Sequence, residues 1–449
     1  MNIILLSGGS GKRLWPLSND VRSKQFIKIF KKPENSAFPE TDDGTGYESM
    51  VQRVYRQIRT VDPEANITVA TSKSQVSALH NQLGTGVGIS VEPCRRDTFP
   101  AIALATAYLH EIMRVSADEA VVVCPVDPYV EDGYFQCMEE MYRTALEKGG
   151  LVLMGIHPTY PSEKYGYILP RTGENGESTL EFKEKPDRET AQRYIDEGCF
   201  WNGGVFAYKL SYVLEKSRKL LGTDSYEKLF HNYAELTKIS FDYAVVEHET
   251  NLHMVLYYGA WKDLGTWNTL TESMEENPVG DARMNETCEN VHIINDMGVP
   301  VLAMGLKNVV ISASPEGILV SDIEQSDNIK PYVDAIDQQI MFAEKSWGSY
   351  RVLDVDDGSM TVKVILNPGH RMNYHSHEKR DEVWMIQRGY GRTIVDGMEQ
   401  PVKVGDVVTM AAGCKHTIVA GEEGLMLIEV QIGSDISVTD KIKYEMPIE

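Results

Sequence analysis

The chain opens on the stretch that decides its fold, IILLSGGSGKRL at residues 3–14. Its apolar run predicts a buried strand, and the glycines that follow predict a tight loop where the strand ends. Glycine lets backbone N–H groups approach a ligand, because no Cβ stands in the way. Lys12 and Arg13, and Lys24 further on, add positive charge. The stretch therefore predicts a phosphate-binding loop for a nucleotide.

Two common glycine-loop motifs do not fit this stretch. A Walker A loop needs Gly at the position of Leu6 and Ser or Thr at the position of Arg13. A dinucleotide-binding fingerprint needs Gly at the position of Leu14. What is left is Gly-x-Gly-x-Arg-Leu with Lys24 downstream. A tight turn with a solvated basic tail is the alternative interpretation.

The composition limits the possible partners. Lys and Arg number 44 against 66 Asp and Glu, a formal charge of −22 over 449 residues. Such a charge argues against nucleic acid or an anionic membrane as a partner. The 6 cysteines form no CxxC pair, which suits a reducing compartment. Because we find neither a charged leader nor an apolar stretch of ~18 residues, we expect a cytoplasmic protein without a membrane anchor.

Residues 1–275 alternate short apolar runs with amphipathic segments. The runs at 67–70, 121–124 and 152–154 predict buried strands, and residues 101–114 and 135–147 predict helices. This alternation is typical of an α/β fold with parallel strands and crossover helices. Ligands of such sheets bind beyond the carboxyl ends of the strands, so we expect the glycine loop and the segment after Cys124 to share one cleft.

The rest of the chain predicts two β-rich parts. Residues 285–340 contain short apolar pieces at 291–294, 299–304, 308–311 and 317–320, separated by single turns and without a convincing helix. This spacing favours a short β-helix or β-roll. Residues 345–449 show strands and Gly/Asp turns, which predict an all-β barrel.

Two isolated aspartates stand where a metal would be needed. Asp127 follows the predicted strand at 121–124, and Asp263 lies in a Trp-Lys-Asp-Leu-Gly-Thr-Trp segment. Nucleotidyl transfer needs its phosphate charge neutralised, usually by Mg²⁺ held on one or two carboxylates and the substrate phosphates. The alternative is a turn residue and a surface acid of no functional importance.

The C-terminal part carries a second metal-ligand pattern. His375 and His377 alternate along one strand, Glu382 follows, and His416 lies on a later strand. Spaced glycines flank these residues, as in the cupin metal signature, and the set predicts a 3-His-1-carboxylate site. We expect a divalent transition metal there, such as Zn²⁺, Co²⁺ or Mn²⁺. A degenerate cupin that serves only as a dimer platform is the alternative.

These motifs together resemble bacterial mannose-1-phosphate guanylyltransferases with a C-terminal phosphomannose isomerase cupin. The resemblance runs in the same order through nearly the whole chain. It predicts a Rossmann-like (GT-A-like) nucleotidyltransferase domain at 1–275, a short left-handed β-helix-like segment at 285–340 and a cupin β-barrel at 345–449. It is carried by the segments 6–17, 23–26, 92–103, 125–127, 155–168, 182–187, 201–206, 242–245, 261–267 and 375–416.

The resemblance also implies roles for single residues. Arg13 and Lys24 would bind the nucleotide phosphates and the attacking sugar phosphate, and Asp127 and Asp263 would hold Mg²⁺. The phosphate oxygen would attack in line without a covalent intermediate, with GTP and mannose-1-phosphate as substrates and a homodimer as the assembly. The remaining substrate-binding residues that the resemblance implies are Gly8, Gly9, Gly11, Arg96, Gly166, Glu184, Lys185 and Asn202.

The sequence departs from the family pattern where specificity is set. Arg95, Asp97 and Phe99 replace the usual residues on the nucleoside side, and Pro128 replaces a histidine after the metal aspartate. In the cupin, Arg380, Glu382 and Trp384 match the isomerase pattern, but three histidines of that pattern are replaced. Mannose-6-phosphate isomerisation is therefore an additional hypothesis. Transfer to another hexose or heptose phosphate, and a non-catalytic sensor or scaffold, are the alternatives.

Overall fold

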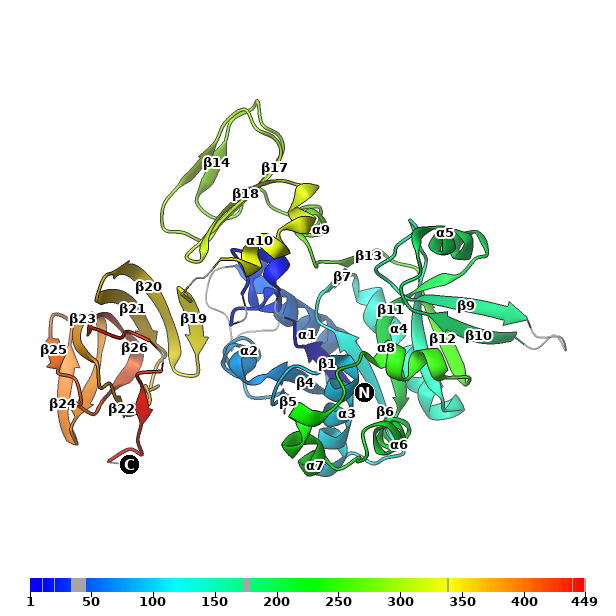
Figure 1. Cartoon of the computed structure of the whole chain (residues 1–449), viewed down its shortest axis with the longest axis horizontal. Helices are drawn as coiled ribbons and strands as arrows, with labels where there is room; N and C mark the ends of the chain where they lie inside the picture. The colour runs from blue at the N-terminus through cyan, green and yellow to red at the C-terminus, as the bar shows by residue number, and fades with distance from the viewer. Residues whose placement is uncertain are drawn as a thin grey trace. The chain divides into compact units, whose positions relative to one another are not determined.

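A computed structural model describes residues 1–9, 11–19, 21–33, 46–172, 178–336, 339–437 and 439–447 (Figure 1). The chain divides into two compact units. The first consists of Met1–Arg13 and Ser23–Glu276, and the second of Leu14–Arg22 and Asn277–Glu449. Among the described residues, no helix is long and apolar enough to span a membrane.

The first unit is built on a mixed sheet with the order β10-β9-β11-β6-β1-β4-β5. In addition, β8 pairs with β11, and β12 pairs with β8. Strands β5, β4, β1 and β6 run parallel, as predicted. The other half differs from the prediction, because β11 runs antiparallel to β6, β8 and β9. The strands are β1 Asn2–Ser7, β4 Asn66–Ser72, β5 Gly88–Glu92, β6 Ala120–Pro125, β8 Leu151–Ile156, β9 Tyr167–Thr172, β10 Ser178–Lys183, β11 Phe200–Lys209 and β12 Leu252–Tyr257.

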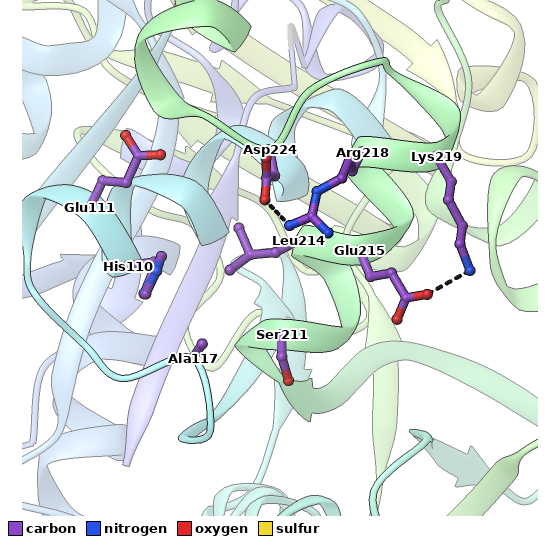
Figure 2. Close-up of a pocket in the computed structure, with 9 residues that line it drawn as sticks. All are labelled: His110, Glu111, Ala117, Ser211, Leu214, Glu215, Arg218, Lys219 and Asp224. Carbon is purple, nitrogen blue, oxygen red and sulfur yellow. Dashed lines mark hydrogen bonds and ion pairs between the residues drawn. The ribbon is translucent and has the colours of Figure 1, made fainter.

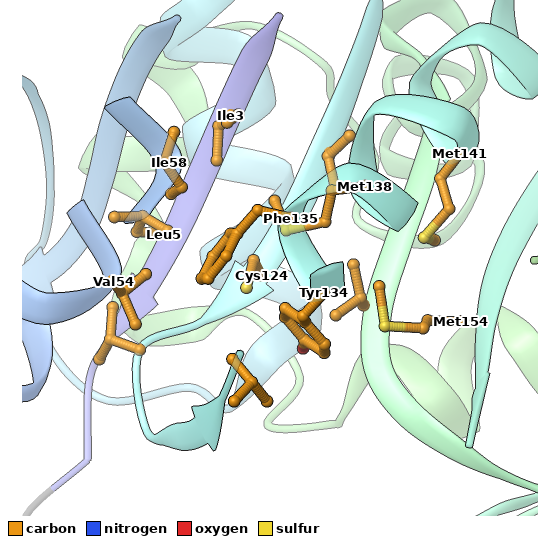
Figure 3. Packing of buried hydrophobic residues seen from close by; sticks show 14 of the residues in the cluster. Ile3, Leu5, Val54, Ile58, Cys124, Tyr134, Phe135, Met138, Met141 and Met154 are labelled. Carbon is orange, nitrogen blue, oxygen red and sulfur yellow. The ribbon is translucent and has the colours of Figure 1, made fainter. Parts of the chain in front are cut away.

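Helices cover both faces of this sheet, which explains the apolar character of β1. Ile3 and Leu5 pack into one buried cluster with α1 and α4 (Figure 3). Ile4 packs into a second buried cluster on the other face. Each fully buried side chain of this size contributes about 1.5–3 kcal/mol. The helices of the unit are α1 Met50–Val61, α2 Val76–Leu83, α3 Thr98–Ala107, α4 Asp132–Lys148, α5 Arg188–Asp196, α6 Leu210–Leu220, α7 Tyr226–His231, α8 Phe241–Ala244 and α9 Trp267–Thr271.

The sheet topology places two predicted motifs side by side. Because β1 and β6 are parallel neighbours with Leu6 opposite Pro125, the glycine loop and Asp127 leave the same edge of the sheet. A small ladder adds the third element, since β13 (Trp261–Asp263) pairs with β7 (Pro128–Val130) and sets Asp263 opposite Pro128. A further pair of strands, β2 (Lys28–Lys31) and β3 (Tyr47–Ser49), completes the unit. The glycine loop, Asp127 and Asp263 are thus brought to one edge of the sheet.

The second unit begins with rungs of parallel strands. β14 (Ala282–Met284) pairs with β16 (Val301–Ala303), and β15 (Glu289–Asn295) pairs with β17 (Lys307–Ser314), both in parallel. Inward side chains such as Val291 and Ile293 form a small core between the rungs. The expectation of no helix in this part is wrong, because α10 (Lys330–Asp334) follows β18 (Gly317–Asp322).

The remainder of the second unit is a curled sheet, which is the predicted cupin architecture. Its long strands β23 and β26 pair along most of their length, and the side chains on the inner face form an apolar cluster around Trp384. The strands are β19 Phe342–Lys345, β20 Gly348–Asp356, β21 Ser359–Leu366, β22 His375–Ser376, β23 Arg380–Val395, β24 Met398–Lys403, β25 Val407–Met410, β26 His416–Gly433 and β27 Ile442–Lys443.

Candidate functional site

The glycine loop begins where β1 ends, and two glutamines hold it. The Gln25 Nε2 donates to the Ser7 carbonyl at 3.1 Å, and the Gln75 Nε2 donates to the Gly9 carbonyl at 3.4 Å. A Cβ added to Gly9 would meet nothing within 4 Å, so the space beside it is open to a ligand. Gly11 has a φ of +64°, a conformation that favours glycine. Ser10 lies outside the described residues.

Lys24, Asp127 and Asp263 come together beyond this loop. The Lys24 Nζ donates to the Asp127 Oδ2 at 2.8 Å and lies 3.9 Å from the Asp263 Oδ1. It also donates to the Leu264 carbonyl at 3.4 Å. The predicted catalytic lysine and both predicted metal carboxylates therefore occupy one small volume, although they are far apart in the sequence.

The charges in this cluster depend on one another. Burial lowers the pKa of Lys24, but Asp127 and Asp263 outweigh it and raise this pKa above its ordinary value. Burial also opposes ionisation of Asp127, yet the Lys24 charge holds the pKa of this carboxyl below its usual range. For Asp263, burial and the neighbouring Asp127 raise the pKa. Arg13 acts on the same groups, because its charge lowers the pKa of both Lys24 and Asp263.

An aromatic wall stands beside these carboxylates, and its three residues were not predicted as site residues. The Tyr165 ring lies 5.1 Å from the Trp201 ring and 5.2 Å from the Trp261 ring, measured between centroids. The indole Nε1 atoms of both tryptophans are buried and have no hydrogen-bond partner among the described residues. All three residues lie within segments of the family resemblance, namely 155–168, 201–206 and 261–267. The presence of an aromatic residue in each of these segments was the signal in the sequence that could have identified the wall.

The predicted sugar-side residues also converge. The Asn202 backbone N–H donates to the Gly166 carbonyl at 2.8 Å. A Cβ on Gly166 would lie 2.6 Å from the Glu184 Oε2 and 2.4 Å from the Phe182 Cζ, so only glycine fits there. The Lys185 Nζ forms an ion pair with the Glu184 Oε1 at 2.7 Å. Gly166, Glu184, Lys185 and Asn202 thus form one cluster, as the resemblance implies.

Asp242 is a further member of this cluster; it lies in the motif 242–245 but was not predicted as a site residue. The Asn202 Nδ2 donates to the Asp242 Oδ1 at 3.0 Å. Burial, with the Glu184 charge as the next cause, raises the pKa of Asp242 to about 7. Its carboxyl is therefore a hydrogen-bonding group whose charge changes near neutral pH.

The raised pKa of Asp242 predicts a pH-dependent stability. The folded protein keeps a proton that the unfolded chain releases near pH 3.8, so stability is lost as the pH rises from about 4 to about 7. Asp242→Asn removes this ionisation. We expect the melting temperature of the variant to exceed that of the wild type by about 2–4 °C at pH 8, with no such gain at pH 4. Calorimetry at both pH values measures it, with the exposed Asp118→Asn as control; equal gains at both pH values would contradict the assignment.

The residues on the predicted nucleoside side make a separate set of contacts. Arg96 donates to the Ala234 carbonyl, and the adjacent Tyr233 hydroxyl donates to the Glu92 Oε2 at 2.8 Å. The Glu92 carboxyl lies close to the glycine loop, because a Cβ added to Gly8 would be 3.4 Å from the Glu92 Oε1. Asp97 has a φ of +70°, and its Oδ1 accepts the Thr98 N–H at the start of α3. This contact shows Asp97 as a helix cap.

The four predicted cupin ligands form a compact buried cluster. The ligand atoms of His375, His377, Glu382 and His416 all lie within 4.8 Å of one another. Each imidazole Nδ1 is within hydrogen-bond distance of a backbone carbonyl, namely those of Asn373, Asp440 and Cys414. These bonds turn every Nε2 towards the centre, which is the arrangement that metal-binding histidines need.

Neighbouring side chains hold the carboxylate of this cluster. The Arg380 Nε donates to the Glu382 Oε1 at 3.2 Å, and the Trp384 Nε1 donates to the Glu382 Oε2 at 3.2 Å. Burial opposes the charge of Glu382, but its bonds with His377 and His416 bring its pKa well below the ordinary value. Three imidazoles and an ionised carboxylate are a donor set that suits a divalent transition metal.

The cluster opens into a cavity of about 930 Å³ in the second unit. Glu429 and Lys441 are among the further titratable groups that line it. Burial, with the Glu382 charge as the next cause, raises the pKa of Glu429 to about 8. Burial also lowers the pKa of Lys441, with Glu429 opposing. The cavity therefore offers acid and base groups besides the four clustered side chains.

Another pocket lies in the first unit between α6 and the helical turn at Tyr108–Ile112 (Figure 2). Its charges pair with each other, since Arg218 bonds Asp224 at 2.5 Å and Lys219 bonds Glu215 at 2.5 Å. None of its lining residues is a predicted site residue. We assign it no role.

The geometry agrees with comparisons to known proteins. Residues 2–278 match the family Nucleotidyl transferase, and residues 335–446 match Mannose-6-phosphate isomerase C-terminal. The chain belongs to the nucleotidyl transferase family and carries the isomerase-type C-terminal domain. The family predicted from the motifs is thereby confirmed.

Relatives match over nearly their full length. The xanthan biosynthesis protein XanB of Xanthomonas campestris pv. campestris (strain B100) is 30% identical over 481 residues, covering 98% of this chain and 97% of that protein. The mannose-1-phosphate guanylyltransferase of Escherichia coli (strain K12) is 26% identical, with 98% and 97% covered. The crystal structure of mannose-1-phosphate geranyltransferase from Thermus thermophilus has a TM-score of 0.61 at 26% identity and covers 74% of this chain and 98% of that chain.

Proposed function

We propose that the first unit catalyses transfer of a guanylyl group from GTP to α-D-mannose 1-phosphate, giving GDP-mannose and pyrophosphate. The observation that carries this proposal is the meeting of Lys24, Asp127 and Asp263 beside an open glycine loop. The substrate pair comes from relatives named mannose-1-phosphate guanylyltransferase that match along the whole chain.

In this proposal each group has a task that its position supports. Lys24 and Arg13 neutralise phosphate charge, so that a sugar phosphate can approach the nucleotide. The cluster around Gly166 and Asn202 orients the sugar, and the attacking oxygen needs no general base because a phosphate is already ionised. Positioning and charge compensation then supply most of the rate enhancement.

Asp127 and Asp263 would hold Mg²⁺ when the substrates bind. Both carboxylates face the same Lys24 ammonium at 2.8 and 3.9 Å, and carboxylate oxygens are the protein ligands that Mg²⁺ prefers. The bound ion would supply additional charge neutralisation at the phosphates.

A turnover panel tests the proposed substrates. Purified protein is assayed for pyrophosphate release with each of four nucleoside triphosphates against mannose, glucose and a heptose 1-phosphate. We expect GTP with mannose 1-phosphate to give the highest kcat/KM, by at least roughly tenfold, the effect of about 1.4 kcal/mol of differential binding. A strong preference for CTP or dTTP would contradict the choice of base. A preference for another sugar would favour the alternative that Asp97 and Pro128 leave open.

A second activity is proposed for the cupin, namely interconversion of mannose 6-phosphate and fructose 6-phosphate with a bound divalent metal such as Zn²⁺, Co²⁺ or Mn²⁺. The buried His/Glu cluster at the end of a large cavity favours it. The metal would polarise the sugar oxygens when bound. The alternative is a non-catalytic sensor. The clustering of Lys24, Asp127 and Asp263 argues against this alternative.

We also propose a cytoplasmic location and a homodimer. All six cysteines are free, which supports a reducing compartment. The dimer is implied by the family resemblance, and sedimentation analysis tests it.

A further inference from the structure

Interconverting an aldose and a ketose requires a group that moves a proton between C1 and C2 of the sugar. The side chains that bind a metal use their lone pairs for the ion, so a different residue must do this. Glu429 and Lys441 line the same cavity as His375, His377 and Glu382. They are therefore candidates for the proton transfer.

The sheet gives Glu429 a fixed position on the inner face. On β26 its cross-strand neighbours are Trp384 of β23 and Val362 of β21. The residue is 8% exposed, and the Gln431 Nε2 donates to its Oε1. One carboxyl oxygen is thus held in place on the inner face of the sheet.

The same register relates Glu429 to the ligand cluster. Glu382 stands opposite Gln431 and is therefore the diagonal neighbour of Glu429. Diagonal neighbours on paired strands lie about 7–8 Å apart. Both positions therefore lie on the same inner face, and both side chains line the one cavity.

Other titratable groups of the cavity are less well placed to transfer a proton to a bound sugar. Asp435 accepts hydrogen bonds from the Ser437 N–H and the Lys379 ammonium, which hold it at the rim. Lys345 lies over the Tyr350 ring at 5.5 Å, and Lys443 is exposed. Lys441, by contrast, is near enough that its charge acts on both Glu429 and His375.

We infer that Glu429 is the catalytic base of the cupin and that Lys441 exchanges protons with the sugar oxygens; this inference rests on the proposed isomerase activity. The Glu429 carboxylate takes the proton from C2 of the aldose, the C2–H electron pair forms the C1=C2 bond, and O1 takes a proton from Lys441. Glu429 then returns its proton to C1 while O2 gives its proton to Lys441 and becomes the carbonyl oxygen. The net change moves one hydrogen from C2 to C1 and one from O2 to O1.

The test compares Glu429→Gln with the wild-type full-length protein, each loaded with Zn²⁺, Co²⁺ or Mn²⁺. Conversion of mannose 6-phosphate is followed by NMR in D₂O, which also reports deuterium entering the sugar at C1 or C2. We expect the variant to lose at least about 10²-fold in turnover, with unchanged metal content and unchanged guanylyl transfer. Glu429→Asp, which keeps a carboxyl group, is expected to retain more turnover than Glu429→Gln.

The exposed Glu423→Gln on the same strand is the matched control and should behave as the wild type. Wild-type turnover in Glu429→Gln would overturn the inference and leave the isomerase proposal intact. Loss of metal from this variant would also overturn it, since Glu429 would then act through the metal site. A wild-type protein that transfers guanylyl groups but does not isomerise would overturn the isomerase proposal together with this inference.

Discussion

Lys24→Ala is expected to lower kcat/KM for guanylyl transfer by roughly 10³-fold, as the loss of one preorganised charge partner does in other enzymes. The variant removes the ammonium that lies 2.8 Å from Asp127 and 3.9 Å from Asp263. Two carboxylates then face the incoming phosphates without their cation. Steady-state pyrophosphate release measures the effect.

The structure offers a control for this variant. Lys219→Ala removes an exposed ammonium whose partner is Glu215, in the pocket of Figure 2, and it should leave transfer unchanged. Metal content of the cupin should be the same in both variants. Unchanged turnover in Lys24→Ala would mean that the phosphates bind elsewhere, whereas a wild type without turnover would favour a sensor.

Glu382→Gln is expected to weaken metal binding by the cupin strongly. The change removes the only carboxylate of the cluster and leaves three imidazoles, which should weaken affinity by 100-fold or more, about 2.7 kcal/mol. For the wild type, metal at about 100 times its Kd should stabilise the fold by about 2.7 kcal/mol, and this gain should vanish in the variant. Elemental analysis and thermal unfolding with added Zn²⁺, Co²⁺ or Mn²⁺ measure both effects.

Glu378→Gln is the matched control, because Glu378 is an exposed carboxylate next to His377 that does not belong to the cluster. It should bind metal as the wild type does. A wild-type protein that takes up none of these metals would favour a cupin that serves only as a structural platform.

The sequence predicted those parts that local pattern determines. The apolar runs at 67–70, 121–124 and 152–154 lie inside β4, β6 and β8, and the helix expected at 135–147 lies inside α4. Motif spacing also placed the four cupin ligands in one cluster. In each case the periodicity of a few residues, or a fixed offset between ligands, carries the information.

Features that depend on distant pairing were not predicted. The antiparallel half of the sheet follows from the direction of β11, which no local run of residues encodes. Asp242 gains its raised pKa from burial and Glu184, and Glu429 gains its place from the register of β26 with β21 and β23. Their roles became visible only when the partner strands and side chains were known.

The division of the chain has a consequence for how this protein can be taken apart. Leu14–Arg22 belongs to the second unit, where Pro16 accepts a hydrogen bond from Ser314 at 2.6 Å and Arg22 bonds Asp296 at 2.7 Å. This segment connects Arg13 to the stretch that holds Lys24. A chain ended at Glu276 would leave the segment without these partners, between two residues of the proposed phosphate site. The transferase part is therefore not an exchangeable module. The chain passes between the two units three times, after Arg13, Arg22 and Glu276, so one cut does not separate them.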